Sequence, residues 1–102
     1  MLSKGRDGEV WYQNGVKFDG MKDGVLIDAK GKYDQFVDDK SGTFKDWYTG
    51  YFGILDEAGR QVRASEGAPI VWYFAQERSK NVFRKLLENI FPQIECIYMP
   101  LK

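Results

Sequence analysis

Short hydrophobic runs alternate with glycine-containing turns in the first third of the chain. These runs predict three short strands, at Val10–Gln13, Val16–Asp19 and Val25–Lys30. The pair Asn14-Gly15 joins the first two strands, and a turn over residues 20–24, which includes Asp23-Gly24, joins the next two. We therefore expect an antiparallel meander of three strands.

Longer segments follow, in which helical and strand patterns alternate. Capped by Thr43 or Asp46, the first predicted helix runs through about Ala64, because apolar residues recur there at helical spacing. The remaining elements are a wholly buried strand at Ile70–Phe74, a helix at about Gln76–Asn89 with Ile90 facing inward, and a strand at Ile94–Tyr98. The segment Gly31–Gly42 is either a short helical turn or a loop anchored by aromatic residues.

The predicted order is three strands followed by helix, strand, helix and strand. Strands that are separated by helices of this length usually pair in parallel through right-handed crossovers. The fold class is therefore α/β, with helices packed on a mixed sheet. At 102 residues and 43% hydrophobic content, the chain is expected to form one domain over residues 1–102.

Several kinds of site are excluded by composition. The sequence contains no histidine, which removes histidine-based triads, zinc sites and general bases. Its one cysteine, Cys96, lies in an apolar strand pattern and is interpreted as a small hydrophobic residue. No stretch is long enough to span a bilayer, and the N-terminus shows no signal-peptide pattern. Catalysis would have to use carboxylates, lysine, other polar groups or a metal ion.

Two acids and a lysine gather around the second predicted turn. Because side chains alternate along a strand, Asp28 and Lys30 point to one face, and pairing with the preceding strand brings Asp19 close to Asp28. Asp19, Asp28 and the carbonyl of Ala29 could supply oxygen ligands to Mg²⁺ or Mn²⁺. The metal would activate a water, and Lys30 would neutralise charge at phosphorus. The plain alternative is that Asp28 and Lys30 are neighbours on a solvated face.

Further residues are candidates at the edge of this site. Gln61 lies on the first long helix and could reach in, although a solvated side chain is the commoner role, and Glu9 is an additional acid. Arg60, Arg63 and Lys32 could contact nucleic-acid phosphates, or could simply be solvated. Trp47, Tyr48 and Tyr51 could stack on bases, although aromatic residues at helical spacing usually belong to a core.

An ordered series of segments resembles a known family. The series includes F-D-G at 18–20, D-A-K-G at 28–31, F-K-D-W at 44–47, L-D-E-A-G-R-Q-V-R-A at 55–64 and G-A-P-I-V-W-Y-F-A at 67–75. It is similar to the PD-(D/E)xK restriction-endonuclease fold and, more narrowly, to the fifth class of restriction-endonuclease-fold toxins of bacterial polymorphic toxins and type VI secretion effectors. Phe18 stands where the motif has proline, and Tyr73 stands where relatives carry histidine.

This resemblance implies a metal-dependent nuclease toxin, with DNA as the favoured substrate, that acts in the cytoplasm of competing bacteria. It also implies delivery by a secretion system, neutralisation by a cognate immunity protein, and a site built from Asp19, Asp28, Lys30 and Gln61. An upstream helix that members of the fold often use would lie before this chain.

Two other classes of protein remain open from the sequence. One is a noncatalytic interaction module, of the immunity or adaptor type, on the same mixed sheet. The other is a different Mg²⁺-dependent phosphoryl-transfer enzyme. The absence of a G-x-x-x-x-G-K-[ST] segment disfavours a nucleotide hydrolase.

Overall fold

The computed structural model describes residues 10–100 and has the predicted mixed α/β architecture. A four-stranded sheet has the order β3-β4-β5-β6, formed by Gly20–Lys22, Val25–Lys30, Ile70–Phe74 and Ile94–Tyr98. In this sheet β3 is antiparallel to β4, whereas β4, β5 and β6 are mutually parallel. The other elements are the two-stranded sheet of β1 (Trp11–Gln13) and β2 (Val16–Phe18), the 3₁₀ turn η1 (Asp34–Phe36), and the helices α1 (Tyr51–Ser65) and α2 (Glu77–Glu88). The predicted fold class is confirmed.

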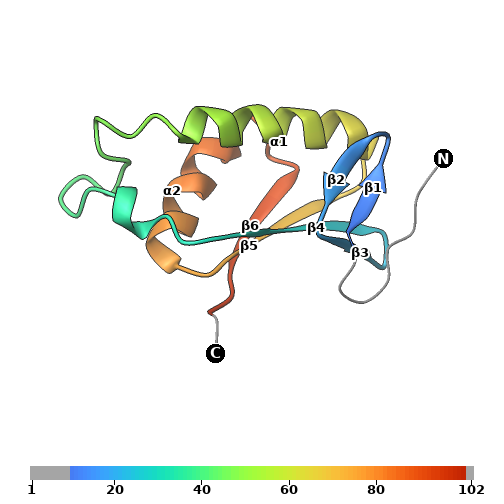
Figure 1. Ribbon diagram of the computed structural model, residues 1–102, viewed down its shortest axis with the longest axis horizontal. Helices are drawn as coiled ribbons and strands as arrows, with labels where there is room; N and C mark the ends of the chain where they lie inside the picture. The colour runs from blue at the N-terminus through green and yellow to red at the C-terminus, as the bar shows by residue number, and fades with distance from the viewer. Residues whose placement is uncertain (1–9, 101–102) are drawn as a thin grey trace.

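Both helices cover the same face of the sheet. The connections from β4 to β5 and from β5 to β6 step across the sheet in one direction, so two right-handed crossovers place their helices on one side. Ala58 of α1 and Phe83 of α2 accordingly share one core with Leu26 and Trp72 of the sheet. Figure 1 shows α1 running along this side, with the β1–β2 hairpin beside its C-terminal end.

The β1–β2 hairpin stabilises the C-terminal end of α1 through polar contacts. The last carbonyls of a helix have no partner within the helix. Here the side-chain amide of Asn14 donates a hydrogen bond of 2.6 Å to the Ala64 carbonyl, and the amide of Gln13 donates one of 3.3 Å to the Ser65 carbonyl. The Asn-Gly turn predicted from the sequence therefore joins two strands and also fixes the hairpin against α1.

The meander differs from the prediction, because it contains four short strands and not three. The turn is confined to Asp23 and Gly24, which have φ angles of 53° and 82° and match the two-residue hairpin turn. Gly20–Lys22 is therefore extended and pairs with β4, with Gly20 opposite Ile27. β2 ends at Phe18, so Asp19 lies at a bend between β2 and β3.

The first helix begins later than predicted, at Tyr51, with Gly50 and neither Thr43 nor Asp46 at its N-cap. Aromatic contacts hold the preceding residues outside the helix. Phe36 stacks on Tyr48 with ring centres 4.0 Å apart. The backbone of Phe44 also forms an antiparallel β-bridge with Val37. The segment after β4 thus combines a short helical turn with an aromatic-anchored loop, which were the two alternatives predicted for it.

Most of the later elements have the expected bounds. The strands predicted at Ile70–Phe74 and Ile94–Tyr98 are confirmed without a shift, and α2 is one residue shorter at each end than predicted. Ile90 was predicted to face inward, but it is exposed because α2 ends before it. Burial raises the pKa of Cys96 to about 11, which agrees with an unreactive hydrophobic role. No helix between residues 10 and 100 has the length and apolar character needed to cross a bilayer.

The core predicts a clear difference between two Phe→Ala variants. Phe83 is fully buried and stacks on Phe74 with ring centres 5.4 Å apart, so Phe83→Ala should lower the free energy of unfolding by about 3–5 kcal/mol. Phe52 is 59% exposed, and Phe52→Ala should change that free energy by about 0.5 kcal/mol or less. Urea denaturation followed by circular dichroism measures both. Equal losses in the two variants would contradict the position of α2 on the sheet.

Candidate active site

Strand β4 places two charged side chains beneath α1. Leu26, Asp28 and Lys30 alternate with outward-facing residues and lie on the face that the helices cover. Asp28 is 7% exposed and Lys30 is 8% exposed. The shared face predicted from the alternation is confirmed, and the solvated face considered as the alternative is not what the structure has. Two charged groups at such depth need partners, since burying an unpaired charge is very unfavourable.

Gln61 of α1 is the first of these partners. Its side chain is fully buried and donates a hydrogen bond of 3.0 Å from Nε2 to Oδ2 of Asp28. Its Oε1 accepts a hydrogen bond of 2.7 Å from the indole Nε1 of Trp72. Because the indole can only donate, it fixes the orientation of the glutamine amide and aims the amide nitrogen at the carboxylate. Of the two positions predicted for the Gln61 side chain, contact with the site and exposure to solvent, the structure has the first.

Glu57 is a further partner, which was not among the site residues predicted from the sequence. It forms an ion pair with the ammonium of Lys30, which also lies 2.7 Å from Asp28 Oδ2 and 4.3 Å from the centre of the Trp72 ring. Lys30 is thus held between two carboxylates and an aromatic face. Glu57 precedes Gln61 by four residues, a spacing that places both on the same side of a helix, and this spacing was the available signal.

Asp19 forms the outer part of the site, at the open edge of β4. The Ala29 N–H donates a hydrogen bond of 2.6 Å to Asp19 Oδ2, in the direction that a neighbouring strand would otherwise occupy. The carboxyl groups of Asp19 and Asp28 are close enough to share a hydrogen bond. The carbonyl of Ala29 points to the same side as its N–H, toward Asp19. The structure therefore brings Asp19, Asp28, Ala29 and Lys30 together at the predicted place.

Burial and mutual contact shift the pKa values of all three charged groups. Burial, with a contribution from the hydrogen bond to Asp19, raises the pKa of Asp28 to about 6. Burial also opposes ionisation of Asp19, but its hydrogen bonds to Asp28 and the Ala29 N–H and the charge of Lys30 lower its pKa. Burial disfavours the charged form of Lys30, but Asp28 and Glu57 outweigh this effect and raise its pKa. Asp19 and Asp28 therefore compete for one proton, as neighbouring carboxyl groups do.

The donor set fits a small divalent cation. Between residues 10 and 100, no group of three or more histidine, cysteine, aspartate and glutamate side chains converges on one point. The carboxyl groups of Asp19 and Asp28 do lie together, and Asp19 lies beside the backbone of Ala29, whose carbonyl is the third candidate oxygen. Mg²⁺ is usually held by one or two carboxylates and retains several waters. A cation between Asp19 and Asp28 would also favour the ionised form of both carboxyl groups, which burial disfavours.

Other predicted residues lie outside this cluster. Arg60 is exposed and pairs with Asp56 one turn earlier on α1, and the exposed Arg63 lies near the β1–β2 hairpin. Lys32 is exposed two residues after Lys30. None of these three side chains makes a hydrogen bond or ion pair to the acids of the site within residues 10–100. Glu9 falls outside the residues that the structure describes.

The two departures from the family motif have structural explanations. Phe18 is fully buried at the end of β2 and fills the core immediately before Asp19. Tyr73 alternates with Trp72 and Phe74 along β5, so it points to the sheet face opposite Asp28. Tyr73 therefore does not face Asp19, Asp28 and Lys30.

Comparison with known families agrees with this geometry. A family model described as restriction endonuclease fold toxin 5 matches residues 4–77, which is most of the chain. The chain belongs to this family. The match in these restriction-endonuclease-fold toxins includes every residue of the Asp19, Asp28, Lys30, Glu57 and Gln61 cluster. A search of curated proteins found no match.

The paired carboxyl groups predict an unusual titration. An unfolded aspartate has a pKa near 4, so the folded toxin domain should hold an extra proton on Asp28 between pH of about 4 and about 6. The contribution of Asp28 to folding stability therefore decreases as the pH rises through that window. Side-chain carboxyl ¹³C shifts should give a midpoint of about 6 for Asp28, and Asp19→Asn should lower this midpoint. The control Asp56→Asn, at an exposed position on α1, should leave it unchanged. A midpoint near 4 in the parent protein would contradict the described contact.

Proposed function

We propose that this domain is a metal-dependent nuclease toxin that hydrolyses phosphodiester bonds of nucleic acid, with DNA as the favoured substrate. The observation that carries the proposal is the convergence of Asp19, Asp28 and Lys30 at the exposed edge of β4. Asp19 and Asp28 could bind a cation, and the ammonium of Lys30 lies beside them, so both kinds of charge could act on one phosphoryl group. Membership of a family of restriction-endonuclease-fold toxins supports the same reaction class.

Asp19, Asp28 and the Ala29 carbonyl would hold the cation, which is Mg²⁺ or Mn²⁺ in this proposal. When bound, such an ion polarises a phosphoryl oxygen and makes a coordinated water more acidic. Asp28 presents one carboxylate oxygen to Gln61 and Lys30, which leaves its other oxygen for a cation. Gln61 keeps this carboxylate in place, and Trp72 keeps Gln61 in place. The site is thus preorganised before substrate binds.

Lys30 would neutralise the negative charge that develops on the phosphoryl group. Its ammonium is oriented by two carboxylates, and both raise its pKa, so Lys30 stays protonated at neutral pH. Glu57 acts as a positioning residue, because its ion pair with Lys30 holds the ammonium independently of Asp28. Such a fixed charge needs no reorganisation during the reaction, which is the main source of electrostatic catalysis.

The biological setting belongs to the same proposal. A nuclease of this family would be delivered by a secretion system into the cytoplasm of a competing bacterium and neutralised in the producer by a cognate immunity protein. A noncatalytic module would gain no stability from burying charged groups in this way, because well-packed hydrophobic residues in their place are often at least as stabilising. The nuclease therefore accounts for more of the geometry than the interaction module does.

The nuclease proposal predicts divalent-ion-dependent cleavage. Plasmid DNA should be degraded with Mg²⁺ or Mn²⁺ and remain intact with EDTA. Asp28→Asn and Lys30→Met should each reduce the rate by about 100-fold or more, because each removes a preorganised charge. Lys22→Met, which removes an exposed lysine from β3, should retain the parent rate within about twofold. Intact DNA and RNA across a series of divalent ions would overturn the proposal.

Glu57 provides a separate test of how Lys30 is positioned. Glu57→Gln should lower the cleavage rate by about tenfold and lower the pKa of Lys30, since the charge that helps to raise it is lost. Lysine ¹⁵Nζ shifts measure this pKa, and single-turnover cleavage measures the rate. The matched control is Glu88→Gln, at the exposed end of α2, which should change neither quantity. A slower reaction with an unchanged Lys30 pKa would exclude a positioning role.

A further inference from the structure

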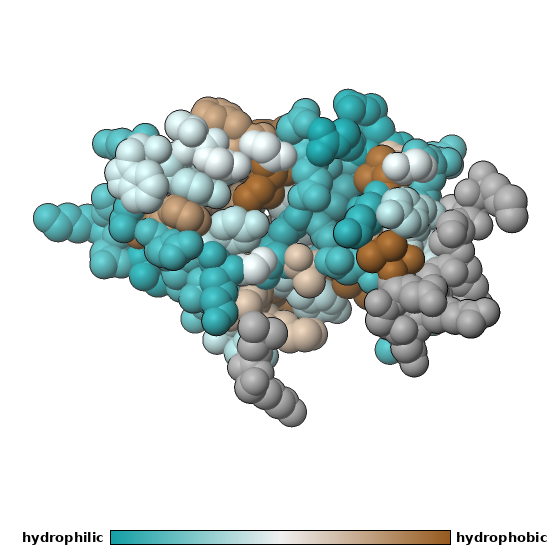
Figure 2. Space-filling model, in the orientation of Figure 1, coloured by the Kyte–Doolittle hydropathy of each residue, from teal (hydrophilic) through white to brown (hydrophobic). Residues whose placement is uncertain are grey.

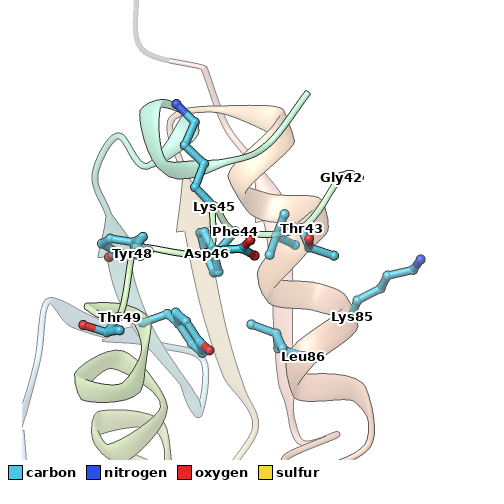
Figure 3. Close-up of a pocket in the computed structure, with 11 residues that line it drawn as sticks. Gly42, Thr43, Phe44, Lys45, Asp46, Tyr48, Thr49, Lys85 and Leu86 are labelled. Carbon is cyan, nitrogen blue, oxygen red and sulfur yellow. The ribbon is translucent and has the colours of Figure 1, made fainter. Parts of the chain in front are cut away.

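A second concave region lies outside the carboxylate site, between the segment before α1 and the surface of α2. The cavity measures about 400 Å³. Its lining comes from residues 42–46, 48, 49 and 51 and from Val82, Lys85 and Leu86 of α2. Figure 3 shows the segment before α1 facing Lys85 and Leu86. This volume is in the range of small-molecule sites, large enough for one base or nucleoside but not for a wide protein interface.

One wall of the cavity is aromatic and is held in place from behind. Phe44 stacks on Tyr51 with ring centres 5.2 Å apart and planes 14° from parallel, and its edge meets the buried Phe83 at 5.1 Å. Tyr48 stacks on Phe36. Because these rings already pack against the core, a planar ligand would find an ordered surface and would not have to immobilise it.

The polar groups at the rim suit an anionic ligand. Figure 3 shows the Lys45 side chain extending from the loop and the Lys85 side chain extending from α2, on different sides of the lining. The lining contains these two lysines, the hydroxyls of Thr43 and Thr49, and one acid, Asp46. Neither lysine forms an ion pair within the part of the chain that the structure describes. Both ammonium groups are therefore available to phosphates.

An exposed tryptophan extends the aromatic surface beside the cavity. Trp47 is 67% exposed and contacts Phe36 edge-on at 5.9 Å, with the Lys45 ammonium 5.9 Å from its ring centre. Figure 2 shows pale, near-neutral groups beside hydrophilic ones on the side of the molecule where Figure 1 places residues 31–50. Aromatic faces beside lysines form a typical surface for single-stranded nucleic acid, whose unstacked bases expose their own faces.

We propose that this cavity and Trp47 bind unstacked bases of a single-stranded nucleic acid, with Lys45 and Lys85 on the adjacent phosphates. The inference rests on the proposed nuclease function, because the bound strand would be the substrate or its unpaired part. Tyr51 precedes Glu57 by six residues on α1, which is roughly 9 Å along the helix axis. Bases held here would anchor a strand whose phosphates continue toward the carboxylate site.

Tryptophan fluorescence in EDTA tests this binding without cleavage. Trp11 and Trp72 are 5% and 0% exposed, so quenching by a ligand reports chiefly on Trp47. A single-stranded oligothymidylate should quench the emission, and a blunt duplex of the same length should bind about tenfold more weakly. Trp47→Phe should abolish most of the quenching and retain binding, measured by fluorescence anisotropy of a labelled strand. Equal affinity for the two substrates, or no quenching, would overturn the proposal.

Charge-removing variants test the cavity itself. Lys85→Ala should weaken single-strand binding several-fold and reduce its salt dependence, whereas Lys22→Ala, at an exposed position on β3, should do so much less. Equal effects of the two variants would overturn the cavity as the binding site. An unchanged affinity for the strand, with a weakened affinity for the cognate immunity protein, would also overturn it and would identify a protein interface. Since cleavage plays no part here, loss of nuclease activity and loss of binding are separable results.

Discussion

The buried ammonium of Lys30 is the group on which the rest of this structure depends. It lies beneath α1 between Asp28 and Glu57, against the face of Trp72. Removing such charges from water is strongly unfavourable, and the loss is offset only if each group is paired and hydrogen-bonded. Within residues 10–100, no buried side-chain nitrogen or oxygen lacks a hydrogen-bond partner. The network is therefore complete, and any shift of α1 along the sheet would leave one of its members unpaired.

The topology explains why the network can also be reached from solvent. Right-handed crossovers bring both helices over one face, so Asp28 and Lys30 are covered by α1. β3 is short and pairs only with Val25–Ile27, so β4 extends beyond it with an open edge. Asp19 occupies that edge and satisfies the Ala29 N–H. The site is covered by α1 on the helix side and open on the side of the exposed Asp19, an arrangement that suits a charged substrate approaching fixed charges.

Where local pattern and tertiary structure agree, the sequence was sufficient. The alternation in Val25–Lys30 and the continuous apolar run in Ile70–Phe74 predicted both strands and the shared face of Asp28 and Lys30. The predicted start of α1 was wrong because Trp47 and Tyr48, which have helical spacing in the sequence, pack on Phe36 and lie outside the helix. The extra strand β3 was missed because the glycine turn is narrower than its composition suggests. Glu57 was missed because its spacing of four residues from Gln61 indicates only a shared side of α1, and not that a lysine from β4 will lie beneath that side.

One helix links the two regions that the proposals concern. Tyr51, at the start of α1, forms part of the cavity, and Glu57 and Gln61 hold the charged groups of β4. These three residues lie on one continuous helix, so a displacement of its first turn would also move the residues of the polar network. The fully buried Gln61 resists such displacement, because a shift would break its bonds to both Asp28 and Trp72. The binding of a nucleic-acid strand at the cavity and the position of the Lys30 ammonium would therefore both depend on the position of α1.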